Sequence, residues 1–219
     1  MTKSEKKLRL QKIVERLKEV YPVAECALDY KGDSWKLLVM GRLSAQCTDA
    51  RVNEVCKTLF EKFPTPADMA VGEISEIEEI VKPCGLYRMK AENIRDSSVL
   101  LVDKYDGKLP DTMEKLLEFP GVGRKIANLL LGDVFGYPAI VCDTHCIRIC
   151  GRLGMYPESE KRPDKIEKIL KSLINENEGS DFCHRIVLFG REICTARSPK
   201  CDACPLSELC LRNQKKDGV

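Results

Sequence analysis

The chain has 219 residues, with 36 Lys and Arg against 34 Asp and Glu, so its formal net charge is only +2. A chain of this length can bury a sizeable core in one large domain or two small ones, and its charge balance means that any nucleic-acid surface must be local. It has no apolar run of the roughly 18 residues that cross a membrane, and its lysine-rich start lacks the apolar core of a secretion signal, so we expect a cytoplasmic protein.

Helical periodicity runs along the whole chain, and no convincing alternating β-pattern interrupts it. Ser4 is the expected cap of the first helix, with Leu8, Ile13, Leu17 and Val20 near its buried face. A short apolar piece follows at 35–40. The other expected helices cover 49–63, two short segments from 66 and from 74 to 81, 87–104, 112–118, 124 to before 136, 144–153, 166–174 and 181–194. The fold class is therefore predicted to be all-α.

A glycine-rich stretch, Phe119-Pro120-Gly121-Val122-Gly123-Arg124-Lys125, joins two of these helices. Glycine permits a tight turn and close approach of the backbone N–H groups to a partner. Because the stretch opens a helix at its positive N-terminal end, it is suited to holding a phosphate. An ordinary tight turn is the alternative, since short glycine motifs occur often by chance.

Twelve cysteines are many for a protein of a reducing compartment, where disulfides do not persist. Cys142, Cys146 and Cys150 recur every four residues along one helical face, and burial as small residues explains this spacing better than metal ligation.

Four further cysteines form a compact C-terminal pattern, C-x6-C-x2-C-x5-C, made of Cys194, Cys201, Cys204 and Cys210. Structural zinc usually shows two paired motifs, whereas this uneven spacing suits an iron–sulfur cluster with one thiolate on each iron. The spacing favours the cluster and leaves zinc, or no metal, as alternatives.

Together these motifs resemble the endonuclease III family, bifunctional DNA glycosylases of the helix-hairpin-helix superfamily. The resemblance extends over about residues 10–212, and its matching pieces are Leu43-Ser44-Ala45-Gln46, Gly85-Leu86-Tyr87, Pro120 to Lys125, Val141-Cys142-Asp143-Thr144-His145 and the four-cysteine loop. It implies a [4Fe-4S] cluster on the four cysteines and two helical domains flanking a DNA-binding cleft. The six-helix domain is expected at 27–137, with the helix-hairpin-helix motif at about 111–135, the iron–sulfur domain at 1–26 plus 138–213, and a tail at 214–219.

The resemblance assigns Lys125 as the catalytic lysine and Asp143 as the catalytic aspartate. A lysine nucleophile must lose its proton near neutral pH, and both Arg124 and a helix N-terminus beside Lys125 disfavour the ammonium form. Taken alone, Lys125 is more simply a phosphate-binding or surface lysine and Asp143 a helix cap. Each stands at a helix start, 18 positions apart, which suits a nucleophile and a carboxylate that serve one site.

The same resemblance assigns DNA contacts to the hairpin and to two further residues. Gly121, Val122, Gly123 and Arg124 would anchor the backbone, with Val122 as the apolar tip, while Gln46 and Leu86 would enter the gap left by a flipped nucleotide. A capping amide and a core leucine are their alternatives. Five basic residues near the cysteines, which could form a local basic patch or a plain solvated surface, are Arg185, Arg191, Arg197, Lys200 and Arg212.

The expected activity is removal of oxidised pyrimidines from duplex DNA, followed by cleavage 3′ to the lesion through a lysine Schiff base and β-elimination. The expected partner is DNA with damaged pyrimidines or abasic sites, bound by a monomer associated with the nucleoid if the source is prokaryotic. Three alternatives are a mismatch adenine glycosylase, a DNA-binding module without activity, and an iron–sulfur redox protein. The adenine glycosylases lack a lysine at the position of Lys125 and carry a further C-terminal domain. The pairing of Lys125 with Asp143 argues against a module without activity, and a redox protein would have no use for a cleft and a DNA-binding hairpin.

Overall fold

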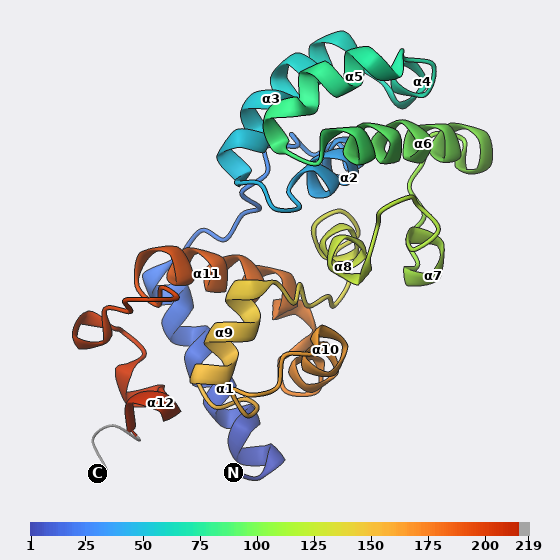
Figure 1. Cartoon of the computed structure of the whole chain (residues 1–219). Helices are drawn as coiled ribbons and strands as arrows, with labels where there is room; N and C mark the ends of the chain where they lie inside the picture. The colour runs from blue at the N-terminus through green and yellow to red at the C-terminus, as the bar shows by residue number, and fades with distance from the viewer. Residues whose placement is uncertain (215–219) are drawn as a thin grey trace. The chain divides into compact units, whose positions relative to one another are not determined.

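The computed structural model describes residues 1–214 and contains helices but no strand over that range, as the periodicity predicts (Figure 1). By its internal contacts the chain divides into two compact units. We call Met1–Glu25 with Gly136–Val219 unit 1, and Cys26–Phe135 unit 2. Residues 215–219, which belong to the predicted tail, lie outside the described residues, whereas Gln214 ends the last helix.

Unit 2 is built around the longest of its helices, α6, which packs against α4, α5 and α2. The indole Nε1 of Trp35 donates to Oγ of Ser98 on α6 at 3.0 Å, so the buried tryptophan on α2 keeps its polar atom satisfied. The helices of unit 2 are α2 (Ser34–Leu43), α3 (Asp49–Lys62), α4 (Pro66–Ala70), α5 (Ile74–Val81), the 3₁₀ turn η1 (Lys82–Cys84), α6 (Tyr87–Tyr105), α7 (Met113–Leu116) and α8 (Arg124–Asp133).

Unit 1 combines the N-terminal helix with the C-terminal part of the chain. Helix α11 contacts both α1 and α9, and α1 also contacts the cysteine-rich segment at η4. The elements of unit 1 are α1 (Lys3–Val20), α9 (Thr144–Arg152), α10 (Pro163–Lys171), η2 (Glu176–Glu178), α11 (Gly179–Glu192), η3 (Cys201–Ala203), η4 (Ser207–Leu209) and α12 (Leu211–Gln214).

The predicted cap of the first helix is wrong. Thr2, not Ser4, caps α1: its Oγ1 accepts from the N–H of Glu5 at 3.2 Å, and the Glu5 carboxylate accepts from the N–H of Thr2 at 2.7 Å. This reciprocal capping box satisfies two N–H groups that the helix leaves without partners. The buried face also differs, since Leu8 and Val20 are exposed while the face that packs consists of Leu10, Ile13, Val14 and Leu17.

The burial predicted for the regularly spaced cysteines is confirmed. Cys142, Cys146 and Cys150 are buried on or beside α9, and Cys183 of α11 lies among them and accepts from the N–H of Val141 at 3.3 Å. The three neighbouring thiols, followed by burial, raise the pKa of Cys146 well above its ordinary value. This cluster is therefore part of the core of unit 1.

Within residues 1–214, no helix is both long and apolar enough to cross a membrane.

Candidate functional site

The glycine hairpin between α7 and α8 has the open backbone that anion binding requires. Gly121 adopts φ +73°, and a Cβ there would overlap Nε of Arg42 and Nδ2 of Asn93, so only glycine fits. Within residues 1–214, the N–H groups of Gly121 and Gly123 find no acceptor, and both glycines are exposed. Gly123 is the N-cap of α8, so these N–H groups lie at the positive end of a helix.

Val122 lies differently from the apolar tip that the sequence suggests. Its side chain is only 7% exposed, and its N–H donates to the carbonyl of Phe119 at 3.0 Å. Val122 therefore points into unit 2 and closes the turn, while the two glycines on either side of it remain at the surface.

Lys125 is the second residue of α8, and its side chain is exposed. The apolar face of the same helix is buried through Ala127, Leu130 and Leu131, which fixes which side of α8 faces solvent. Close approach of α8 to α2 is possible because Gly41 of α2 stands opposite Ile126 and Leu129. Lys125 thus projects from the rigid, first turn of a helix, directly after the hairpin.

Gln46 and Leu86 lie on two loops that are both in strained backbone conformations. Gln46 has φ +55° and Leu86 has φ +49°, a left-handed region that non-glycine residues rarely adopt. Both side chains are exposed, and Leu86 is 52% exposed despite being large and apolar. A strained position that presents an apolar side chain to solvent points to a binding role.

Asp143 caps α9, the structural role that a lone aspartate before a helix suggests. Its Oδ1 accepts from the N–H of Cys146 at 2.7 Å, and the side chain is half-buried. Asp143 belongs to unit 1 and Lys125 to unit 2.

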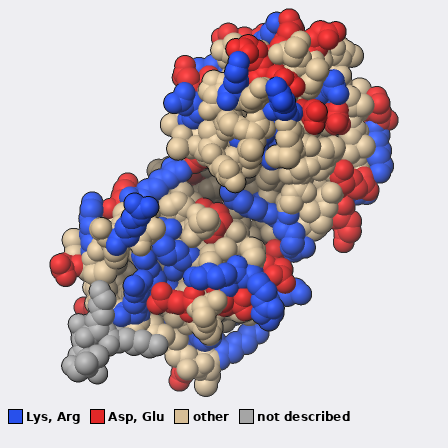
Figure 2. Space-filling model, viewed as in Figure 1, with Lys and Arg blue, Asp and Glu red and all other residues tan. Residues whose placement is uncertain are grey.

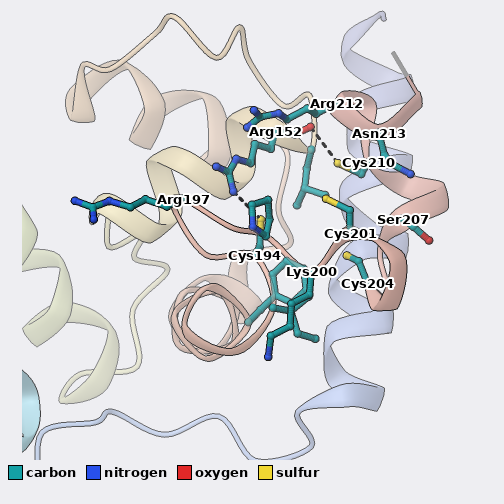
Figure 3. Close-up of a pocket in the computed structure, with 14 residues that line it drawn as sticks. Arg152, Cys194, Arg197, Lys200, Cys201, Cys204, Ser207, Cys210, Arg212 and Asn213 are labelled. Atoms are coloured by element: carbon teal, nitrogen blue, oxygen red, sulfur yellow. Dashed lines mark hydrogen bonds between the residues drawn. The ribbon is translucent and has the colours of Figure 1, made fainter. Parts of the chain in front are cut away.

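The four C-terminal cysteines line one cavity of about 210 Å³ in unit 1 (Figure 3). A single water needs only about 10–15 Å³ by such a measure, so the cavity is far larger than one small ion requires. Figure 3 shows Cys201, Cys204 and Cys210 on the C-terminal loop and Cys194 beside Arg152. In the described part of the chain, no three His, Cys, Asp or Glu side chains converge on a point as ligands of a single ion would.

This arrangement fits an iron–sulfur cluster, whose irons occupy separate corners of a larger object. Burial raises the pKa of the Cys204 thiol, and ionisation of the three neighbouring thiols would raise it further. Four thiolates can therefore coexist here only with positive charge among them, which a cluster of irons supplies.

Arg152 of α9 borders the same cavity, and no sequence motif marks this arginine as a neighbour of the cysteines. It donates through Nη1 to Sγ of Cys194 at 3.3 Å and to the carbonyl of Thr195 at 2.8 Å, and through Nη2 to the carbonyl of Ala196 at 3.0 Å. The Sγ of Cys210 donates in turn to the carbonyl of Arg152 at 3.5 Å. Only folding brings this arginine, 42 positions before Cys194, to the cysteine loop.

The predicted basic patch near the cysteines is wrong for one of its members. Arg185 is 5% exposed and binds the carbonyl of Tyr21 at 3.0 Å and the carboxylate of Asp181 at 3.4 Å, so it holds unit 1 together rather than facing solvent. Arg212 pairs with Glu158 at 3.7 Å on the surface. Figure 2 nevertheless shows Lys and Arg gathered over the visible face of unit 1, while on unit 2 they alternate with Asp and Glu.

Two family models match the chain. Residues 39–176 match the HhH-GPD superfamily of base excision DNA repair proteins, and residues 194–210 match the iron–sulfur binding domain of endonuclease III. The second match begins at Cys194 and ends at Cys210, so it spans the cysteine loop.

Individual proteins are similar over nearly the whole chain. Endonuclease III of Bacillus subtilis (strain 168) is 40% identical over 204 residues, which cover 93% of this chain and 92% of the relative. A solved non-covalent endonuclease III–DNA complex is 39% identical with a TM-score of 0.90, and the match covers all of both chains. A trapped endonuclease III–DNA covalent intermediate is 40% identical with a TM-score of 0.89, and the match covers 99% of each.

The all-α fold, the open glycine hairpin and the cysteine-lined cavity thus occur in a chain that is similar to endonuclease III from end to end, and the chain belongs to the endonuclease III family of the HhH-GPD superfamily of base excision DNA repair proteins.

Proposed function

We propose that this chain excises oxidised pyrimidines from duplex DNA and cleaves the strand 3′ to the resulting abasic site, acting as a bifunctional DNA glycosylase and lyase. The observation that carries the proposal is the hairpin before α8. Two exposed glycine N–H groups at a helix N-terminus suit a DNA phosphate, and Lys125 follows Gly123 by two positions, in the first turn of α8. The similarity to DNA complexes of endonuclease III, one of them covalent, supports the same assignment.

Binding begins with the DNA backbone. The N–H groups of Gly121 and Gly123 hold a phosphate next to the lesion, and Arg124 adds positive charge beside them. Because Val122 is buried, it contributes by keeping the turn in shape. These contacts fix the register of the duplex and carry no sequence information, as a repair enzyme that meets lesions in any sequence requires.

Gln46 and Leu86 fill the space of the damaged nucleotide once it leaves the stack. The reactive sugar carbon is out of reach inside the duplex, so the nucleotide must be extruded, at a cost of a few kcal/mol. An exposed apolar side chain and an exposed amide can occupy the gap and partner the orphaned base, which offsets part of that cost. Their left-handed backbones present both side chains outward from unit 2.

Lys125 is the nucleophile. Its neutral amine attacks C1′, the bond from C1′ to the base breaks, and the base leaves with a proton. Opening of the sugar ring then gives an imine between Nζ and C1′. The protonated imine acidifies the C2′ proton, and its loss expels the 3′ phosphate oxygen, which breaks the strand 3′ to the lesion.

Asp143 supplies the carboxylate of the reaction. It assists removal of the proton from the attacking amine and stabilises the positive charge that develops on the sugar as the base departs. Its cap bond to the N–H of Cys146 uses Oδ1 and holds the carboxylate in one orientation.

Cys194, Cys201, Cys204 and Cys210 hold the [4Fe-4S] cluster, which we assign to the cavity that they line. When bound, the cluster would crosslink the four cysteines of the loop and could also exchange electrons, at a potential that its surroundings set. What the chain itself contributes there is a fold that ties the C-terminal loop to α9 through Arg152. We further infer a monomer that works in the cytoplasm on nucleoid DNA.

The test is a strand-cleavage assay with a duplex that carries a single thymine glycol, run beside duplexes with an abasic site and with an adenine mismatch. The proposal predicts release of thymine glycol and a nick 3′ to the site. Excision without strand cleavage would replace it with a monofunctional glycosylase, and selective excision of mismatched adenine would favour the adenine glycosylase alternative.

A further inference from the structure

Lys90 lies on the buried side of α6, and fully buried lysines are rare in proteins. Its side chain has 0% exposure, and it is among the largest fully buried side chains of the chain. Burial of an ammonium is costly unless its hydrogen bonds are satisfied. Burial also lowers the pKa of Lys90, with the cation Arg42 contributing in the same direction.

The Lys90 ammonium satisfies all three of its N–H donors on backbone carbonyls. Nζ lies 2.8 Å from the carbonyl oxygen of Leu43, 2.7 Å from that of Ala45 and 2.8 Å from that of Cys84. Leu43 is the last residue of α2 and Ala45 lies in the loop after it, whereas Cys84, about forty positions later, ends η1 just before a second loop. One side chain therefore links both loops at a single point.

The two loops are those that carry Gln46 and Leu86. Ala45 directly precedes Gln46, Cys84 stands two positions before Leu86, and the N–H of Lys90 donates to the carbonyl of Leu86 at 3.1 Å. Both Gln46 and Leu86 hold left-handed backbones that cost of order 1 kcal/mol each, so they persist only where their surroundings fix them.

A thiol pair lies beside the same junction. Cys47 follows Gln46, and its thiol is close enough to that of Cys84 to raise the pKa of Cys84. Burial raises the pKa of Cys84 to about 11, so this thiol stays protonated near neutral pH and contributes a weak neutral contact. The charged bonds of Lys90 are the stronger link between the loops.

We propose that Lys90 is a positioning residue for lesion recognition, whose ammonium holds the Gln46 and Leu86 loops in the conformation that inserts both side chains into DNA. The inference rests on the proposed function, because it assigns Lys90 to the insertion step. Because the loops are fixed before binding, insertion does not incur the entropic cost of ordering them. Lys90 itself does not touch DNA.

The primary test compares Lys90→Met with a matched control, Leu101→Ala, which removes a fully buried side chain from the same helix. The ligand is a duplex with a tetrahydrofuran abasic analogue, which cannot form a Schiff base, and the reference is the intact duplex. Without Lys90 the two side chains must be ordered on binding, so Lys90→Met should weaken binding of the analogue about tenfold and leave binding of the intact duplex unchanged. Leu101→Ala should leave the ratio of the two affinities unaltered.

Two measurements exclude a merely structural role. A 2-aminopurine opposite the analogue reports insertion by its fluorescence, and Lys90→Met should lose the signal at saturating protein while Leu101→Ala keeps it. In Lys90→Ala, added propylammonium restores the missing three carbons and ammonium and should restore the signal. Tetramethylammonium, a cation with no N–H donor, should not.

Failure of this inference can be told from failure of the proposed function. If Gln46→Ala and Leu86→Ala do not weaken analogue binding, the insertion step itself is wrong. If they do and Lys90→Met matches Leu101→Ala, Lys90 is not a positioning residue. If Lys90 acts through Leu86, the double variant Lys90→Met/Leu86→Ala should lose less than the sum of the two single losses, and full additivity would overturn the inference.

If Lys90→Met does not fold, the inference can be tested by NMR on the wild-type protein. In ¹⁵N-lysine-labelled protein, the Nζ signal of Lys90 should exchange slowly with water and should shift on binding the analogue duplex but not the intact one. Equal responses to the two duplexes would contradict the proposal.

Discussion

The guanidinium of Arg152 donates to Sγ of Cys194 across 3.3 Å, a bond that an iron-bound thiolate can still accept, while the carbonyl of the same residue lies 3.5 Å from Sγ of Cys210. Arg152 therefore contacts both the first and the last cysteine of the cluster loop. It couples the loop to α9, the helix that Asp143 caps (Figure 3).

Replacing Arg152 with Met should loosen the cluster. The change leaves the carbonyls of Thr195 and Ala196 without their donor and removes positive charge from beside the thiolates, at a cost of about 2–4 kcal/mol in stability. Loss of a hydrogen bond to a cluster sulfur should also lower the reduction potential. Iron content per chain, absorbance at roughly 400 nm during exposure to air, and voltammetry measure these effects.

Arg212→Met is the control for Arg152→Met. Arg212 lines the same cavity, but its ion pair with Glu158 lies on the surface, where such pairs contribute about 0–1 kcal/mol. Equal loss of iron from the two variants would mean that the Arg152 contacts have no special role.

Substitution of the two hairpin glycines should separate folding from DNA binding. Gly121→Ala strains a left-handed backbone and overlaps Arg42, so we expect a loss of about 2 kcal/mol or more in the free energy of unfolding. At Gly123 a Cβ meets nothing within 4 Å and φ is −98°, so the alanine there should cost at most about 1 kcal/mol, mainly at the cap.

Both alanines keep the backbone N–H but add a Cβ beside it, which hinders the approach of the phosphate. Each should therefore weaken DNA binding by about fivefold for each N–H contact that it impairs. Urea titration and binding to a tetrahydrofuran duplex measure the two effects. A Gly123→Ala variant with normal stability and normal affinity for DNA would show that the hairpin does not contact DNA.

Asp143 allows the cap and the reaction to be tested apart. Asparagine caps a helix as well as aspartate does, so Asp143→Asn should keep the stability of the wild type, whereas Asp143→Ala should lose about 1 kcal/mol. Both should lose base excision by about 10²–10⁴-fold, because neither carries a carboxylate. Single-turnover excision of thymine glycol measures the rate, and near-normal excision by Asp143→Asn would leave this residue as a cap only.

The free energy of unfolding of the wild-type protein should rise with pH relative to that of Lys90→Met. Burial lowers its pKa in the folded chain below the ordinary 10.5, so between the two values the unfolded chain binds more protons. The contribution of Lys90 to the free energy of unfolding is therefore complete above pH 10.5, and it is lost as the pH falls through the pKa of Lys90 in the folded chain. The difference in unfolding free energy between wild type and Lys90→Met should widen from pH 7 to pH 10, and a difference that shrinks would contradict the lowered pKa.

Much of the fold was predictable because each element carries a local signal. Thr48, Pro66 and Asp143 begin helices where their cap or first-turn preferences say they should, and Gly136 follows the end of α8 as expected. The predicted cap of α1 is wrong because two capping residues, Thr2 and Ser4, stand close together. Only the reciprocal bond from Glu5 selects Thr2.

The site was less predictable, because much of it depends on contacts between distant parts of the chain. The spacing of the cysteines indicates a metal centre, but nothing in the sequence connects Arg152 to it. Likewise, Lys90 reads as an ordinary helix-surface lysine until the carbonyls of Leu43 and Cys84 are found around its ammonium. Val122 reads as an exposed tip, yet the turn directs its side chain into the core.

Covalent trapping shows whether Lys125 attacks the sugar carbon of the lesion. The wild-type protein and Lys125→Ala are incubated with an abasic-site duplex and borohydride, which reduces an imine to a stable amine. We predict a protein–DNA adduct for the wild type and none for Lys125→Ala at protein concentrations that saturate a tetrahydrofuran duplex. An adduct of undiminished yield with Lys125→Ala, or no adduct with a wild-type protein that cleaves the same duplex, would contradict the account.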